Sequence, residues 1–149
     1  MVPELLIALL VLILTAYWFR YKCLVILRAT AARDRARQVA AANHLSFAEI
    51  AARLEGDVPA EELRRFHAAL LRDYTVLTCL LRYSSAVPAG SYSVEERMLM
   101  LDFKLMHLWF TLVRGLARGP ARRSLAERTR ILFHFGNRMA ERSAVLSKA

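Results

Sequence analysis

The sequence predicts an all-α protein, with a single N-terminal transmembrane helix followed by a cytoplasmic helical bundle of about four helices. Three observations carry this prediction. Leu5 to Phe19 form an uncharged apolar run. Three serines are each followed by a glutamate three residues later, the pattern that caps a helix N-terminus. No segment alternates β-branched and polar residues as a strand does. At 149 residues and 56% hydrophobic, the chain has the size of one domain, and a membrane helix accounts for its apolar excess.

The apolar run predicts a membrane anchor with its interfacial flank over residues 1–28. With the four residues before it, the run gives roughly 27 Å of helix, slightly less than a hydrocarbon core of about 30 Å. Residues 23–27 extend the apolar length if the cations before them reach the interface. The alternative is an apolar helix buried in a partner protein; a cleaved signal peptide is disfavoured because the start has no basic side chain. We expect the membrane–water interface at Tyr17, Trp18, Arg20, Tyr21 and Lys22.

Charge predicts the orientation of the anchor. Glu4 is the only charged side chain before the apolar run, whereas cations dominate after it: Arg20, Lys22, Arg28, Arg33, Arg35 and Arg37. Because loops rich in Lys and Arg stay in the cytoplasm, the N-terminus is expected outside and the C-terminal body inside. Heavy use of arginine and alanine is typical of a GC-rich bacterial genome, so the predicted location is the bacterial inner membrane. Its lipid bilayer is the first expected partner, because anionic headgroups attract these cations.

Behind the anchor, the sequence predicts a basic Ala/Arg-rich helical connector over residues 29–45 and a helical bundle over residues 46–149. Thr30 to Ala42 contains no helix breaker, so the anchor helix is expected to continue as one rod to Ala42. Further helices are expected at 47–54, 59–83, 94–117 and 121–146, with breaks at Gly56, Gly90 and Gly119-Pro120. The three capping boxes pair Ser46 with Glu49, Ser93 with Glu96, and Ser124 with Glu127.

The helix expected at 94–117 is apolar on most sides, with a narrow polar strip that includes Glu96 and Lys104. So wide an apolar arc indicates burial on several sides, and we expect this helix to be the central one of the bundle. A second membrane span is the alternative. Charged residues in mid-segment, Asp102 among them, argue against it at a cost of about 3 kcal/mol each. Apolar surface that the bundle leaves uncovered predicts contacts with a partner protein at Met98, Met106, Trp109 and Phe110.

Asp102 lies at the centre of the apolar arc of this helix, where an unpaired charge is prohibitive. A structural salt bridge to Arg72, Arg82 or Arg138 is the leading interpretation. A carboxylate that binds a ligand or handles protons, and a contact with another subunit, remain alternatives. His67 also lies in an apolar stripe and is interpreted as a core histidine. If Asp102 and His67 pair between helices, they form the candidate cofactor-binding site of the chain.

Catalytic and metal-binding motifs are absent from the sequence. It has no Glu-x-x-His pair, no C-x-x-C, no nucleophile elbow and no glycine-rich phosphate loop, so no catalytic residue, metal or cofactor is predicted. We therefore expect a non-enzymatic accessory, assembly or scaffolding subunit that contacts other membrane or membrane-associated subunits. One alternative is a membrane-tethered regulator, because residues 47–54 and the helix after Pro59 resemble a helix-turn-helix; its long, partly acidic second helix argues against nucleic acid as a partner. The other alternative is a bundle that binds a cofactor or small molecule.

Overall fold

A computed structural model of the chain describes residues 1–29, 33–83 and 92–148, and all regular structure in these residues is helical. The all-α fold class is thereby confirmed. Six helices occur in the described part of the chain: α1 (Val2–Ala29), α2 (Arg33–Ala42), α3 (Phe47–Arg53), α4 (Ala60–Tyr83), α5 (Val94–Val113) and α6 (Arg118–Lys148).

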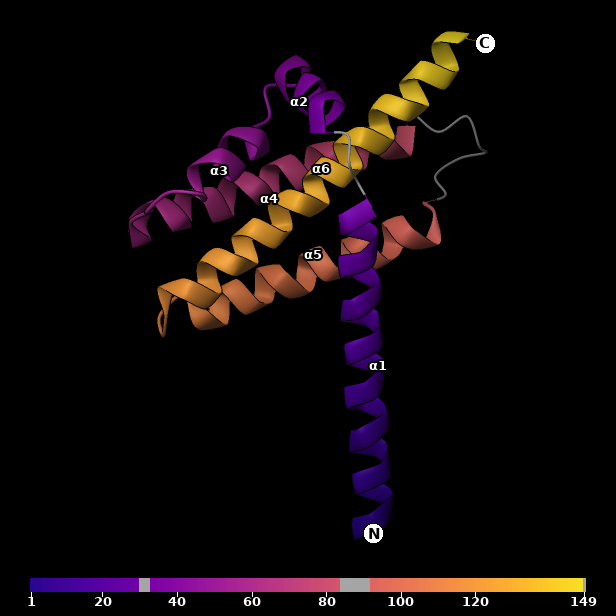
Figure 1. Ribbon diagram of the computed structural model, residues 1–149, viewed down its shortest axis with the longest axis vertical. Coiled ribbons are helices and arrows are strands. Elements are labelled where there is room, and N and C mark those ends of the chain that lie inside the picture. The colour runs from indigo at the N-terminus through magenta and orange to yellow at the C-terminus, as the bar shows by residue number, and fades with distance from the viewer. Residues whose placement is uncertain (30–32, 84–91, 149) are drawn as a thin grey trace.

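Helix α1 projects from the body as an isolated rod (Figure 1). Residues 1–18 of the chain are exposed, and contact with the body begins at Phe19 and Arg20. The segment Val2–Leu27 is long and apolar enough to cross a membrane, with a mean hydropathy of 2.1, and it is the one such segment among the described residues. An uncovered apolar helix of this length is unfavourable in water, because transferring each exposed aliphatic side chain out of water lowers the free energy.

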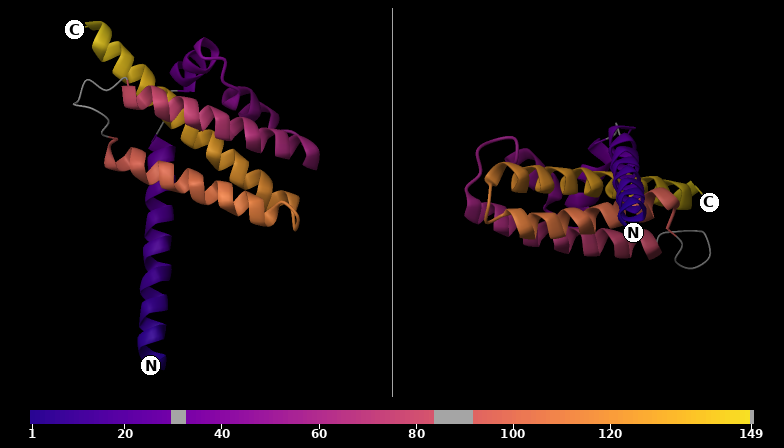
Figure 2. Two further views of the ribbon diagram at one scale, coloured as in Figure 1. Left: turned by 180° about the vertical axis from the view of Figure 1, so that it is seen from behind. Right: turned by 90° about the horizontal axis from the view of Figure 1, so that it is seen from below.

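The central helix of the body is α6, not the helix of residues 94–117. Helix α6 runs diagonally between α4 and α5 and packs against each of the other five helices (Figure 2). Its middle contributes fully buried side chains such as Ile131, Leu132 and Phe135. Gly136 allows α2 to approach closely, because a Cβ at this position would lie 3.0 Å from the Cβ of Ala36. The apolar pattern of residues 94–117 reflects two separate surfaces of α5. One is buried against α6 and includes Phe103, and the other is exposed and includes Leu108.

The anchor helix does not continue as one rod to Ala42, since α1 ends at Ala29 and a separate helix begins at Arg33. Helix α2 folds back onto α6, where the side-chain oxygen of Asn137 accepts a hydrogen bond of 3.0 Å from the backbone N–H of Ala36. At its other end His44 adopts a left-handed conformation, with φ of 54°, and Leu45 N–H donates to Ala40 O at 2.8 Å. This C-terminal motif turns the chain into α3.

Only one of the three predicted capping boxes forms. Ser93 accepts a hydrogen bond from the N–H of Glu96, whose carboxylate accepts one from the N–H of Ser93. Ser46 makes no side-chain cap, because its hydroxyl accepts a hydrogen bond from Arg72 of α4. Ser124 lies inside α6, which begins earlier than predicted, and its hydroxyl donates to the carbonyl of Met106. Pro120 is tolerated in the first turn, where backbone N–H groups lack partners within the helix. The predicted break at Gly90 lies outside the described residues.

Candidate functional site

The most distinctive polar arrangement of the molecule joins the apolar helix to the body. The guanidinium of Arg20 donates hydrogen bonds to Asp102 of α5 and to Glu127 of α6. Arg20 Nη1 lies 2.8 Å from Asp102 Oδ1, Nη2 lies 2.9 Å from Glu127 Oε2, and Nη1 also binds Glu127 Oε1. We call Arg20, Asp102 and Glu127 the junction cluster. It connects three helices through one bidentate and one single contact, which fixes both the depth and the rotation of α1.

Burial makes the junction cluster energetically important. The side chain of Asp102 is fully buried and that of Glu127 nearly so, whereas Arg20 is 36% exposed. Burial and the adjacent Glu127 carboxylate together raise the pKa of Asp102 from 3.8 to about 7, against the opposing charge of Arg20. Because two carboxylates face one guanidinium, a proton held by Asp102 makes the cluster neutral. The folded chain therefore binds a proton at Asp102 more tightly than the unfolded chain does. The stabilisation that results is complete below about pH 4 and is lost as the pH rises through about 7.

The predicted partners of Asp102 were wrong. Arg72 lies beside Asp73 at 3.4 Å, and Arg138 lies 3.6 Å from Glu95 and 3.5 Å from Glu141. The cation that reaches Asp102 comes instead from α1, where sequence patterning assigned Arg20 to the lipid headgroups. The two contacts of Arg20 span 82 and 107 residues of sequence, so no local pattern could identify them.

The other predicted interface residues lie on the outer surface of α1. Tyr17, Trp18 and Tyr21 are exposed, and the ammonium group of Lys22 lies 5.8 Å from the Trp18 ring centroid. The next residue after Lys22, Cys23, is fully buried against the body, with Sγ 3.9 Å from the carbonyl oxygen of Met98. The end of the apolar segment therefore packs against protein, which leaves the part from Val2 to Trp18 free.

His67 does not pair with Asp102 but belongs to a second, half-buried group. Its ring stacks on His107 and on Phe110, with centroids 4.2 and 4.3 Å away. Arg128 Nη1 donates to His67 Nδ1 at 2.7 Å, which places the imidazole proton on Nε2. Burial, together with the positive charge of Arg128, lowers the pKa of His67 from 6.5 to about 4. The proposed pair of His67 and Asp102 is therefore not formed, and the half-buried ring of His67 accepts a hydrogen bond from Arg128 instead.

Arg128 is a buried cation that the sequence did not indicate. It is fully buried, although other arginines lie close to it in the sequence. No carboxylate lies within ion-pair distance of it in the described part of the chain. Its charge is instead offset by the His67 ring, the His67 carbonyl and the face of Phe103, 4.5 Å from the guanidinium carbon. Burial lowers the pKa of Arg128 to about 10.

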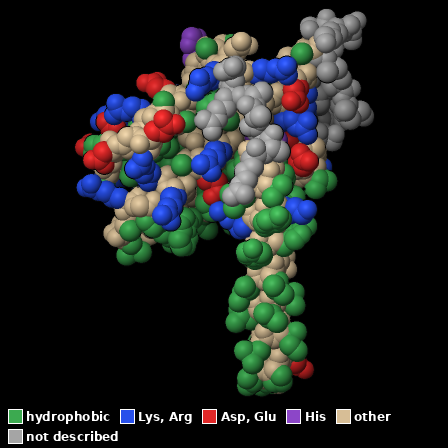
Figure 3. Space-filling view, in the orientation of Figure 1, with side chains coloured by type: hydrophobic (Ala, Val, Ile, Leu, Met, Phe, Trp, Pro, Cys, Tyr) green, Lys and Arg blue, Asp and Glu red, His purple; other side chains and the backbone are tan. Residues whose placement is uncertain are grey.

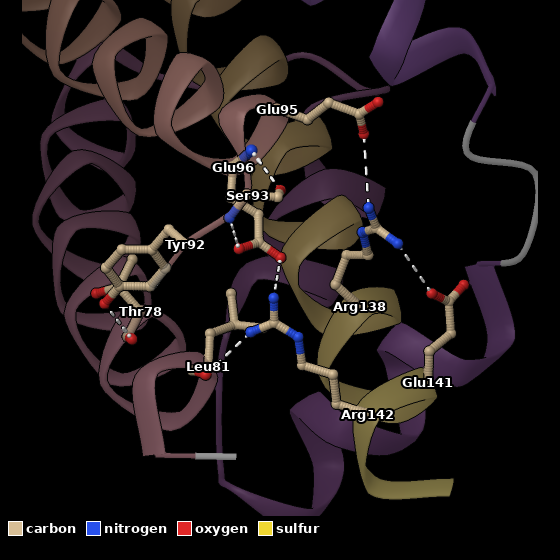
Figure 4. Close-up of polar contacts among 9 residues, drawn as sticks. All are labelled: Thr78, Leu81, Tyr92, Ser93, Glu95, Glu96, Arg138, Glu141 and Arg142. Carbon is tan, nitrogen blue, oxygen red and sulfur yellow. Dashed lines mark hydrogen bonds and ion pairs between the residues drawn. The ribbon is translucent and has the colours of Figure 1, made fainter. Parts of the chain in front are cut away.

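Two further buried carboxylates hold other helix ends in place. Glu96, predicted on a polar strip, is fully buried; it accepts the capping bond of Ser93 and a hydrogen bond of 2.7 Å from Arg142 of α6 (Figure 4). Arg142 also donates a hydrogen bond to the carbonyl of Leu81, so this one side chain of α6 contacts both α4 and α5. Asp73 accepts the backbone N–H of Ser46 at 2.7 Å. Each buried acid thus joins segments that are distant in the sequence.

The four predicted partner contacts divide between the core and the surface. Phe110 is 1% exposed, so it is not available to a partner and this prediction was wrong. Met98 packs at the edge of the core and Met106 is half-buried. Trp109 lies on the exposed face of α5. No group of three His, Cys, Asp or Glu side chains suited to a metal ion occurs among the described residues.

Replacing Arg20 by Met is expected to lower the free energy of unfolding by about 3 kcal/mol, because Asp102 and Glu127 stay buried without their counter-charge. Chemical denaturation of the full chain in detergent measures this loss. The triple variant Arg20→Met/Asp102→Asn/Glu127→Gln should recover most of it. Lys22→Met is the matched control, since Lys22 is an exposed cation of the same helix. An equal effect of both single substitutions contradicts a stabilising junction cluster.

His67 is expected to stay neutral at pH 5, where an unperturbed histidine is mostly protonated. Its lowered pKa means that the unfolded chain binds more protons than the folded chain between about pH 6.5 and 4. The contribution of His67 is therefore present above pH 6.5 and is lost as the pH falls toward 4. NMR of the ring carbons, assigned with a His67→Gln variant, measures the titration. A midpoint near 6.5 would show that Arg128 does not face the ring.

No protein-family model matches the chain, and no curated protein or solved structure shows a significant match to it.

Proposed function

We propose that this chain is a non-enzymatic accessory, assembly or scaffolding subunit of a protein complex in a bacterial inner membrane. Helix α1 anchors it in the bilayer, with the N-terminus outside and the helical body in the cytoplasm. The observation that carries the proposal is the junction cluster, in which Arg20 of the apolar helix is held by two buried carboxylates of the body.

A rigid connection distinguishes a positioning subunit from a tethered domain. A protein that needs only to stay near a membrane can hang from a flexible linker, which leaves its body free to rotate. Here α1 contacts both α5 and α6, and Cys23 and Leu27 bury their side chains against the body. The body therefore keeps one height and one rotation relative to the anchor, as a subunit with fixed neighbours requires.

The apolar segment also supplies a surface for partner subunits. Its side chains from Leu5 to Leu14 are exposed all round, with no polar stripe that would mark a water-filled path. Within a bilayer such a helix packs against lipid or against the helices of other membrane proteins. Outside the bilayer, a net charge of +9 favours acidic partners and anionic headgroups.

The orientation can be measured with the native cysteines, because Cys79 is exposed on α4 while Cys23 is buried. A maleimide that cannot cross membranes is expected to leave intact cells unlabelled and to label Cys79 after permeabilisation. A Cys79→Ser variant should lose this label, which controls for reaction at Cys23. Labelling of Cys79 in intact cells would place the body outside and contradict the orientation.

The partner can be sought with a photoreactive residue in place of Leu10, which is exposed within the apolar segment. Irradiation of membranes followed by detergent extraction should give one adduct of defined mass with another membrane subunit. The same residue placed at Leu71, exposed on α4, is the control for contacts by the body. Recovery of the chain alone at both positions counts against the accessory-subunit proposal.

A further inference from the structure

Helix α5 exposes a continuous row of large apolar side chains, which we call the α5 outer face. Its members follow helical spacing and are 42–61% exposed: Leu101, Leu105, Leu108, Trp109 and Leu112. At 100° per residue they occupy an arc of about 100°. The opposite side of the same helix is buried against the core through Leu99, Phe103 and Phe110. Helix α5 is thus apolar on two sides, and the body covers only one of them.

The α5 outer face lies on the side of the body from which α1 projects. Helix α5 is the element of the body nearest the free part of α1 and runs across its line (Figure 1). In the space-filling view, hydrophobic side chains gather on this underside, whereas charged side chains cover the flank above it (Figure 3). A flat surface that meets α1 at the body would therefore meet the α5 outer face as well.

The contacts between α1 and α5 set the depth of this face. Arg20 binds Asp102, and Cys23 lies against the carbonyl of Met98, so α5 crosses α1 one turn beyond Trp18. The free part of α1, from Val2 to Trp18, is roughly 25 Å long at 1.5 Å per residue. A hydrocarbon core is about 30 Å thick. If α1 spans the hydrocarbon core, the body must approach the bilayer until Arg20 reaches the headgroups. Because Arg20 contacts α5, the headgroups then also reach α5.

We propose that the α5 outer face rests in the headgroup region of the bilayer that α1 enters, as an amphipathic interfacial helix. This inference depends on the membrane anchoring proposed above. The chemistry of the edge fits: Arg97 and Lys104 are exposed and follow one edge of the apolar arc, where cations meet anionic headgroups. Trp109 is the residue type enriched at this depth. A partner protein on this face would have to occupy the headgroup layer beside α1.

Intrinsic fluorescence tests the proposal directly, because the chain has two tryptophans, Trp18 and Trp109. A Trp18→Phe variant of the full chain, reconstituted at one copy per nanodisc, leaves Trp109 as the reporter. Lipids brominated near the carbonyl end of the acyl chain should quench its emission about twofold, since interfacial helices bury their apolar face about 5–10 Å deep. Lipids brominated near the chain end should quench it less.

Three further variants separate the possible outcomes. Trp109→Phe leaves Trp18, whose quenching reports insertion of α1 alone. Leu108→Glu in the Trp18→Phe background should reduce the quenching of Trp109, whereas Leu71→Glu, an exposed leucine of α4, should not. Emission from Trp109 that is unquenched while Trp18 is quenched overturns the lipid contact and leaves the anchor intact. A blue-shifted but unquenched Trp109 also overturns it and indicates cover by protein. Loss of quenching at both tryptophans refutes the membrane anchor itself.

Discussion

The ion pairs of Arg20 determine how the molecule is assembled, because they join the apolar helix to two helices of the body. A guanidinium at the end of an apolar segment ordinarily reaches for lipid headgroups. In this chain the core supplies Asp102 and Glu127, and the cation turns inward. Both carboxylates are shielded from solvent, so the arrangement is stable only while Arg20 is present. The position of α1 and the ionisation of the core therefore depend on each other.

The same use of buried charge recurs through the bundle. Asp73 holds the start of α3, Glu96 joins α5 to α6, and Arg128 lies between aromatic rings and a neutral histidine. A body of three long helices has little core, and polar contacts at defined positions select one packing where aliphatic side chains alone permit several. The pKa values of Asp102 and His67 move in opposite directions, so their effects on stability partly cancel between pH 4 and 7.

Helix α5 is apolar on two opposite sides, only one of which faces the core. It faces the core on one side and exposes leucines and Trp109 on the other, at the level where the free part of α1 ends. Under the membrane anchoring proposed above, this face would give the body a second attachment point beside α1, which fits the proposed role of a subunit held at a fixed height above the bilayer. It would also account for the apolar surface that α4 and α6 leave uncovered.

The sequence by itself determined the features that depend on neighbours a few residues away: the apolar segment before Phe19, the all-helical class and the capping box at Ser93. Only the tertiary structure decided that Arg20 turns inward, that α6 rather than α5 is central, and that Phe110 is buried while Trp109 is exposed. The reason is physical. Periodicity shows that a helix has an apolar side, but which part of that side meets protein depends on contacts separated by 82 and 107 residues.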